Sequence, residues 1–297
     1  MRKEVFAILK KYAIIKEIKQ KAGGADAAER MKCQPFELDV VNANGGKRNK
    51  ESKQTFSRWE KVFSIAEERK RKERKKNMSL TDRLYAVAKP IWEGYLEQPF
   101  VKELGEGTLR EDRFRFYMVQ DYRYLLQYAK VFAMGVVKTE DEALMTRFSY
   151  MVHDTLDGEM NIHKAYMSRL GITEQEVATT KSTLTNQSYT SYMLDEAYKG
   201  GPLEILVAVL SCAWSYQMIG EHHQHVPGAL EHPLYGEWVR GYCSKEYCET
   251  TQEIIDLVNE LGKDISAERE AHLKEIFENC SRYEAMFWDM AYEEIPE

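Results

Sequence analysis

The spacing of apolar residues constrains the fold of this chain more than any other feature. From residue 78 onward, apolar residues recur every three to four positions, and strand-type alternation is almost absent. Only seven prolines occur in 297 residues, so little interrupts long helices. Helices of this length, joined by short loops and without intervening strands, predict an all-α helical bundle.

Capping residues, prolines and glycines predict where the helices begin and end. The sequence Ser79–Asp82 is a helix-capping signal, and Pro99 should end the helix that follows it. Pro202 suits the first position of the most apolar helix. We expect helices from the cap to about residue 97, then over 109–138, 140–170, a short stretch after Thr173, 188–199, 202–225, a short stretch after Pro233, 244–261 and 265–294.

Charge divides the chain into two segments. Residues 1–77 carry 22 Lys and Arg against 11 Asp and Glu, whereas residues 78–297 carry 20 against 37. Only one of the 18 tyrosines, Tyr12, precedes residue 78. We predict a basic extension over 1–77, disordered or partly helical and possibly not native, and a helical catalytic domain over 78–297. The extension could bind phosphate backbones nonspecifically, but basic runs are more often solvated tails, and we assign it no function.

The composition also indicates where in the cell the protein is expected. No run of about 18 uncharged apolar residues is present, and the N-terminus lacks the apolar region of a signal peptide. These features argue against a membrane span and against secretion. The five cysteines are too few, and odd in number, for a disulfide framework. We therefore expect a cytoplasmic protein whose cysteines are reduced: Cys33, Cys212, Cys243, Cys248 and Cys280.

Three helices carry side chains capable of chemistry. On the apolar helix, Cys212 and Tyr216 are four residues apart and share a face. A lone cysteine there is usually an inert buried group, and a reactive thiol needs polar neighbours that stabilise the thiolate. The hydroxyl of Tyr216 is one candidate for that role.

The other two helices each place a carboxylate among aromatic residues. Tyr117, Asp121, Tyr124 and Tyr128 form one stripe, and a buried Asp121 must find a donor partner or a polar ligand. Near the C-terminus, Glu284 shares a face with Phe287 and Trp288. Crowding by aromatic rings should raise the pKa of Glu284, which suits a general acid near neutral pH. If the three helices converge, the site could hold a flat heterocycle and attack it.

Metal sites are weakly supported. Glu159 and His163 are four residues apart, with His153 ten earlier, but a di-iron bundle needs paired Glu-x-x-His motifs. The cluster Glu221–His225 fits a surface position better, and Cys243 and Cys248 lack the second pair of a zinc site. No glycine-rich phosphate loop is present. We predict no metal and no cofactor.

Several spaced blocks from residue 78 to the C-terminus resemble the TenA/thiaminase II family of aminopyrimidine aminohydrolases. Residues 1–77 lie outside the resemblance. The blocks that carry it are Gln98-Pro99-Phe100-Val101, Gly107-Thr108-Leu109, Tyr117 to Leu125, Ser188 to Met193, Cys212-Ala213-Trp214-Ser215-Tyr216, Gly220-Glu221 and Tyr283 to Tyr292.

The resemblance implies a haem-oxygenase-like helical bundle, usually a homotetramer, that works without a cofactor. It implies hydrolysis of the methylene C–N bond of aminomethyl-aminopyrimidine, a product of thiamine degradation, and of thiamine itself. The products would be hydroxymethylpyrimidine and either ammonia or the thiazole. The partners would be the small-molecule substrate and other copies of the chain; a membrane or nucleic acid is not expected.

The resemblance also implies a role for each matched residue. Cys212 matches the nucleophile that adds to the pyrimidine ring, and Glu284 matches the acid that protonates a ring nitrogen. Asp121 matches the carboxylate that holds the aminopyrimidine edge. Tyr124 matches the phenol that polarises the thiol. The remaining matches contact substrate or form pocket walls: Tyr216, Tyr189, Tyr242 and Phe287.

Two alternatives stay open at this point. A non-enzymatic regulatory or ligand-binding protein could use the same scaffold, although the excess of acidic residues beyond 78 would repel DNA. Haem binding is suggested by the fold alone, and residues 80–98 lack the expected proximal histidine. Arg123 and Cys243 depart from the family pattern and could alter substrate preference. The sequence does not rank thiamine against its degradation products.

Overall fold

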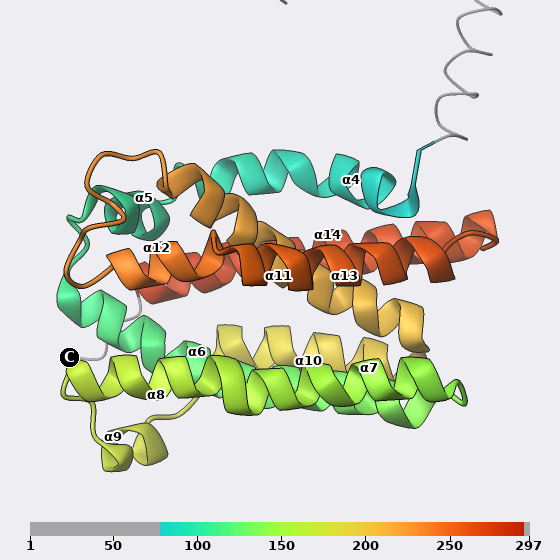
Figure 1. Ribbon diagram of the computed structural model, residues 1–297, viewed down its shortest axis with the longest axis horizontal. Helices are drawn as coiled ribbons and strands as arrows, with labels where there is room; N and C mark the ends of the chain where they lie inside the picture. Colours follow the sequence, from blue (N-terminus) through green and yellow to red (C-terminus); the bar gives the residue numbers. More distant parts are fainter. Residues whose placement is uncertain (1–77, 294–297) are drawn as a thin grey trace, which may run out of the picture. The chain divides into compact units, whose positions relative to one another are not determined.

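A computed structural model describes residues 78–293 of the chain. This part is built of helices, and none of its residues forms a strand. The central helices are α11 (Pro202–His223), α13 (Lys245–Leu261) and α14 (Ala267–Glu293). Figure 1 shows α4 (Leu80–Tyr95) along one side of them and the long helix α6 (Glu111–Lys138) along the other. The prediction of an all-α bundle is confirmed for the described residues.

The remaining elements complete the two sides and close one end of the bundle. Helix α10 packs against α6, α11 and α14, and α12 packs against α11. Figure 1 shows α5 and α12 near the same end. The bounds of these elements are Pro99–Glu106 for α5, Glu142–His153 for α7, Asp154–Glu159 for the π-helix η1, Met160–Arg169 for α8, Glu174–Thr179 for α9, Leu184–Lys199 for α10 and Gly236–Tyr242 for α12.

Most predicted helix ends hold to within about two residues, but there are three differences. The helix predicted over 188–199 begins four residues earlier, at Leu184, where Thr183 caps it. Pro99 does not merely end the first helix; it occupies the first turn of α5, where its missing N–H costs nothing. The helix predicted over 140–170 contains the π-helical turn η1 between α7 and α8. A π-turn adds a residue to one turn of a helix and often occurs at functional sites. Apolar spacing alone does not reveal it, because the residues on both sides keep helical periodicity.

The core is a continuous set of apolar and aromatic side chains between the two sides. Phe100, Tyr117 and Trp288 stack on one another, with ring centroids 5.1–5.6 Å apart. Trp92 of α4 donates a hydrogen bond to the Ser281 hydroxyl of α14 over 3.0 Å. The aromatic residues that distinguish this part of the sequence therefore form the interior of the bundle.

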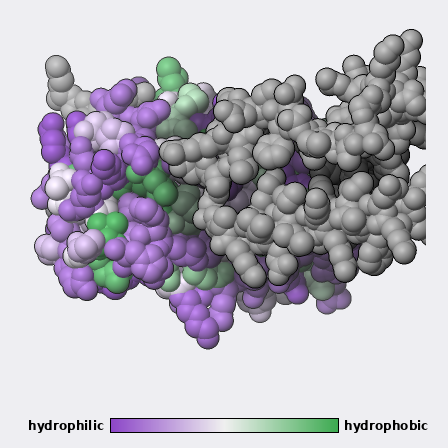
Figure 2. All heavy atoms as spheres, turned by 90° about the horizontal axis from the view of Figure 1, so that it is seen from above, coloured by the Kyte–Doolittle hydropathy of each residue, from purple (hydrophilic) through white to green (hydrophobic). Residues whose placement is uncertain are grey.

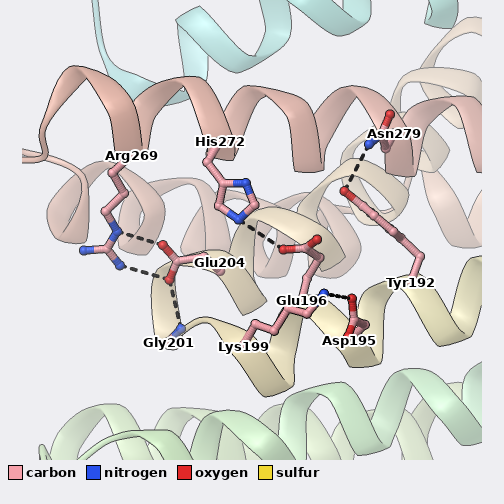
Figure 3. Close-up of polar contacts among 9 residues, drawn as sticks. All are labelled: Tyr192, Asp195, Glu196, Lys199, Gly201, Glu204, Arg269, His272 and Asn279. Atoms are coloured by element: carbon pink, nitrogen blue, oxygen red, sulfur yellow. Dashed lines mark hydrogen bonds and ion pairs between the residues drawn. The ribbon is translucent and has the colours of Figure 1, made fainter.

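The junction of α10 and α11 is tied to α14 by a partly buried ion pair. Glu204 receives two hydrogen bonds from Arg269, of 2.7 and 2.9 Å, and a third from the Gly201 N–H (Figure 3). Burial alone would raise the pKa of Glu204, but these hydrogen bonds outweigh it and lower that pKa. The pair thus fixes the start of α11, the helix that carries Cys212.

Helix α11 has the length and apolar composition of a membrane-spanning helix. However, 78% of its most apolar stretch is buried inside the bundle, as expected for a core helix. No other helix among residues 78–293 meets the same test. On the face seen in Figure 2, the coloured surface is mostly hydrophilic, and hydrophobic residues form small patches.

Candidate active site

Cys212 lies at the centre of the bundle, on the face of α11 that looks toward α6. It lines a cavity of about 20 Å³ together with Asp121, Tyr124, Tyr216 and Tyr242. A space of this size holds about one water molecule. The rest of its lining is Leu125, Tyr128, Glu159 and Tyr247. Helices that are far apart in sequence thus meet around the thiol.

The surroundings of the Cys212 thiol disfavour its charged form. Burial, followed by the charge of Glu284, raises its pKa well above the usual range, while the Tyr124 hydroxyl offsets part of the rise. Tyr124 and Tyr216 both line the small cavity with the thiol, so each phenol is a polar neighbour of Cys212. A thiol in this environment needs help to lose its proton before or as it attacks.

Glu284 is buried close to this thiol. Burial is the main reason that its pKa rises to about 8, and the charge of Asp121 adds to the rise. Tyr189, Tyr216 and Cys212 approach the carboxyl and partly offset that shift. Even so, Oε2 of Glu284 makes no hydrogen bond within the described part of the chain. A buried carboxyl with an unused oxygen can hold and transfer a proton near neutral pH.

Asp121 has a donor partner that the sequence did not suggest. His163 of α8 places Nε2 2.6 Å from Oδ2 of Asp121, and both side chains are about 5% exposed. Its Nδ1 lies 3.0 Å from the carbonyl oxygen of Glu159. Because both ring nitrogens face acceptors, the geometry fits the doubly protonated imidazolium. Burial alone would lower the pKa of His163, but the hydrogen bond and charge of Asp121 outweigh it and raise that pKa to about 8.

Aromatic rings surround the thiol and the two carboxyls. Tyr124 packs against Tyr189 and Phe287, with ring centroids 5.2 and 5.9 Å apart. Tyr216 packs against Tyr242 at 4.8 Å. Burial raises the pKa of each of these four phenols well above the usual range, so they remain neutral hydrogen-bond donors. Tyr189 and Phe287 lie behind Tyr124 and do not line the small cavity.

A larger cavity of about 400 Å³ adjoins the small one. The two share four lining residues, Tyr128, Glu159, Tyr242 and Tyr247. The larger cavity is lined mainly by α6, η1, α8, α12 and α13, and acidic side chains occur on its walls while Lys and Arg do not. The shared side chains therefore separate the thiol from a space large enough for a small organic molecule.

The structure brings the predicted site residues into one region from α6, α10, α11, α12 and α14. Glu159 and His163, which the sequence suggested only as weak metal candidates, belong to the same region. Their i, i+4 spacing on one face was the available signal. No three His, Cys, Asp or Glu side chains within residues 78–293 converge as a metal site would require.

The two departures from the family pattern point away from this region. Arg123 donates hydrogen bonds to the Ser182 hydroxyl, over 3.0 Å, and to the Val177 carbonyl, over 3.2 Å. It therefore ties α6 to α9 and to the segment that follows α9. Cys243 lines neither of the two cavities, although its neighbour Tyr242 lines both. Neither side chain is placed to contact a molecule bound beside Cys212.

The fold and the site together define a helical bundle with a cysteine and carboxyl groups in an aromatic interior. The TENA/THI-4/PQQC family model matches residues 85–294, and the chain belongs to this family. An aminopyrimidine aminohydrolase of Helicobacter pylori is 48% identical over 216 residues, which are 73% of this chain and the whole of that protein.

Solved structures agree with this assignment. A TenA homologue from P. horikoshii superposes with a TM-score of 0.67 at 31% identity, over 72% of this chain and 99% of that one. A domain with a heme oxygenase-like fold from Shewanella denitrificans gives a TM-score of 0.59 at 18% identity, over 73% of this chain and 94% of that domain. At that identity the likeness concerns the fold alone, and it confirms the predicted haem-oxygenase-like bundle.

Proposed function

We propose that the protein is an aminopyrimidine aminohydrolase of thiamine salvage. The reaction replaces the amine of aminomethyl-aminopyrimidine by a hydroxyl group, and the proposal extends to cleavage of thiamine. The observation that carries it is that Cys212 and Asp121 line one small cavity, while Glu284, which does not line that cavity, is buried close to both side chains. Membership of the family and the name of the Helicobacter pylori relative support the same activity.

In the proposed mechanism, the first step adds the thiol across a ring C–N bond. The sulfur of Cys212 bonds to a ring carbon, and Glu284 gives a proton to a ring nitrogen and then takes the thiol proton. This relay removes the need for a free thiolate, which burial disfavours. Adding the nucleophile and a proton makes the ring electron-rich enough to expel the group on its methylene carbon.

Other side chains hold the ring during this step. Asp121 accepts hydrogen bonds from the exocyclic amino group, and the hydrogen bond with His163 keeps the carboxylate oriented. The hydroxyl of Tyr124 polarises the thiol, and Tyr216 contacts the substrate. Tyr189, Tyr242 and Phe287 form the walls. A pyrimidine ring exceeds the space beside Cys212, so the side chains shared with the larger cavity must turn aside to admit it.

The test is turnover of aminomethyl-aminopyrimidine by the full chain, followed by chromatography of hydroxymethylpyrimidine, with thiamine as a second substrate. We expect Cys212→Ser to lose at least about a hundredfold in kcat/KM, because serine is a far weaker nucleophile near neutral pH. The matched control is Cys248→Ser, a half-buried cysteine whose sulfur faces Glu221. Turnover of Cys212→Ser within about tenfold of wild type would remove this residue from the nucleophile role.

We further propose that the protein works as a homotetramer in the cytoplasm. Several large apolar side chains on its surface support an assembly; Leu184, Val137 and Tyr198 are 81%, 74% and 72% exposed. The cysteines within residues 78–293 are all free, as in a reducing compartment. Light scattering coupled to gel filtration gives the mass directly, and a monomeric mass would contradict the assembly.

A further inference from the structure

We propose that Glu159 is a second proton-transfer residue of this reaction: it accepts the proton of the water that replaces the leaving group. The inference rests on the proposed function and adds a residue to it. It assigns a role to a carboxyl that lies in the wall between the two cavities.

The need for such a group follows from the chemistry. The leaving group is a protonated amine or a thiazolium, so it departs with the electron pair of the broken C–N bond and needs no further proton. The ring then carries an electrophilic exocyclic methylene and a positive charge. When water bonds to this carbon, its extra proton must go to a base while the electron pair returns to the ring. The C–S bond then breaks, Glu284 returns the thiol proton to the departing sulfur, and it takes back the proton of the ring nitrogen.

Glu284 is poorly suited to take both protons. It serves the ring nitrogen on the side of α14, and from the first step until the sulfur leaves it holds the proton taken from the thiol. A separate base on the opposite side of the methylene carbon avoids this conflict. Glu159 enters the same small cavity from η1, with Cys212 and Asp121 on the other walls. That cavity is large enough for one water molecule.

The surroundings of Glu159 suit a base that gains and loses a proton. Its carboxyl has one polar side-chain contact, the Tyr242 hydroxyl at 3.4 Å from Oε1. It is half-buried and borders the larger cavity, through which water and product can pass. The π-turn η1 ends at this residue, and the α8 residue His163 donates to its backbone carbonyl. The π-turn η1 and the buried His163–Asp121 pair together position the carboxyl of Glu159.

The charges facing Glu159 leave its pKa near neutrality. Burial is the main cause of the rise to about 7, and His163 opposes it. Asp121 of α6 and Asp154 of η1 add to the rise, whereas the Tyr242 hydroxyl of α12 opposes it. The remaining titratable neighbours are neutral groups with raised pKa values: Tyr128 of α6, Cys212 of α11 and Tyr247 of α13.

The experiment compares Glu159→Gln with wild type in the full chain. Glutamine keeps the size but accepts no proton, so turnover of aminomethyl-aminopyrimidine should fall about 10²- to 10⁴-fold. Because bond cleavage precedes water addition, the pyrimidine should accumulate on Cys212, as seen in the intact mass of acid-quenched enzyme. The matched control is Asp157→Asn, an exposed acid of the same π-turn that pairs with His153, and it should retain wild-type turnover.

Rescue of turnover by azide distinguishes a catalytic role of Glu159 from a structural one. Azide bonds to the methylene carbon without a proton to lose, so it should restore turnover of Glu159→Gln and give the azidomethylpyrimidine. Turnover within about threefold of wild type would overturn the inference. A loss with no adduct and no rescue by azide would overturn it as well, since Glu159 would then act earlier or only in folding. If wild type itself fails to turn over the substrate, the proposed function fails and this inference fails with it.

Discussion

At the scale of single residues, the protonation of the Cys212 thiol and that of the Glu284 carboxyl are coupled. Burial raises the pKa of both groups, and the charge of Glu284 raises that of the thiol further. Interacting groups of this kind titrate as a pair. The form that can react holds both protons, because Glu284 must have a proton to give to the ring nitrogen and the thiol proton then replaces it. Since the pKa of Glu284 is about 8, this form is lost, and turnover should fall, as pH rises through that value.

A stability measurement tests the protonation of Glu284 separately from catalysis. Its pKa is raised in the folded protein, so between about pH 4.5 and 8 the folded state holds more protons than the unfolded state. The free energy of unfolding should therefore fall with pH across this window, by at most about 1.4 kcal/mol per pH unit from this group. Glu284→Gln lacks this dependence, so urea unfolding should show its stability rising relative to wild type from pH 5 to 8.

The same variant should be folded but poorly active, with turnover lower by about two to four decades, because glutamine cannot relay the proton. Glu275→Gln, on an exposed position of α14, controls for the loss of a charge. A labile Glu284→Gln protein that retains turnover would instead mean that the carboxyl only supports packing. Parallel stability curves for the variant and wild type would mean that the carboxyl is ionised in the folded protein.

At the scale of elements, the close approach of α11 and α12 brings Tyr242 to the site. Gly220 of α11 makes this approach possible, because a Cβ atom there would lie 2.7 Å from the backbone carbon of Tyr242. Backbone atoms cannot turn aside as a flexible side chain does. A glycine in this family block is therefore needed to place Tyr242, which lines both cavities.

Gly220→Ala should therefore push α12 away from α11. We expect about 1–3 kcal/mol lower stability from the forced contact and about a 10- to 100-fold loss in kcat/KM from the displaced Tyr242. Gly94→Ala is the control, because a Cβ atom at Gly94 meets nothing within 4 Å. Thermal melts and steady-state kinetics on both variants give the comparison. A Gly220→Ala protein with wild-type kinetics would show that Tyr242 does not depend on this approach.

At the scale of the molecule, residues 78–293 contain the described core and all of the candidate site residues. The family model matches residues 85–294, which coincide with this region almost throughout. The predicted basic extension over 1–77 lies outside the described residues, so the two-segment organisation stays a prediction.

Truncation tests that prediction. A chain that begins at Met78 should keep the helical circular dichroism, the melting temperature and the kcat/KM of the full chain. The reason is that the apolar residues forming the core and the chemistry-bearing side chains all follow this position. The full chain, prepared in parallel, is the control. Loss of solubility or a large drop in activity after truncation would show that residues 1–77 contribute to folding or to the site.

The sequence by itself determined the all-α fold, most helix boundaries and the candidate site residues. These features depend on local information, namely apolar spacing, capping residues and family motifs, which a linear chain displays directly. Cys212 and Glu284, for example, were found without knowing that their helices touch. Spacing could not show that both enter one interior, because the contact depends on how α11 and α14 pack.

Only the tertiary structure identified the partner of Asp121 and the position of Glu159. His163 is 42 residues from Asp121, and the π-turn that orients both His163 and Glu159 leaves no trace in apolar periodicity. The raised pKa values of Glu159 and His163 likewise come from burial and from charges on other helices. Such effects act through space over a few ångströms, so they appear only when helices distant in sequence are brought together.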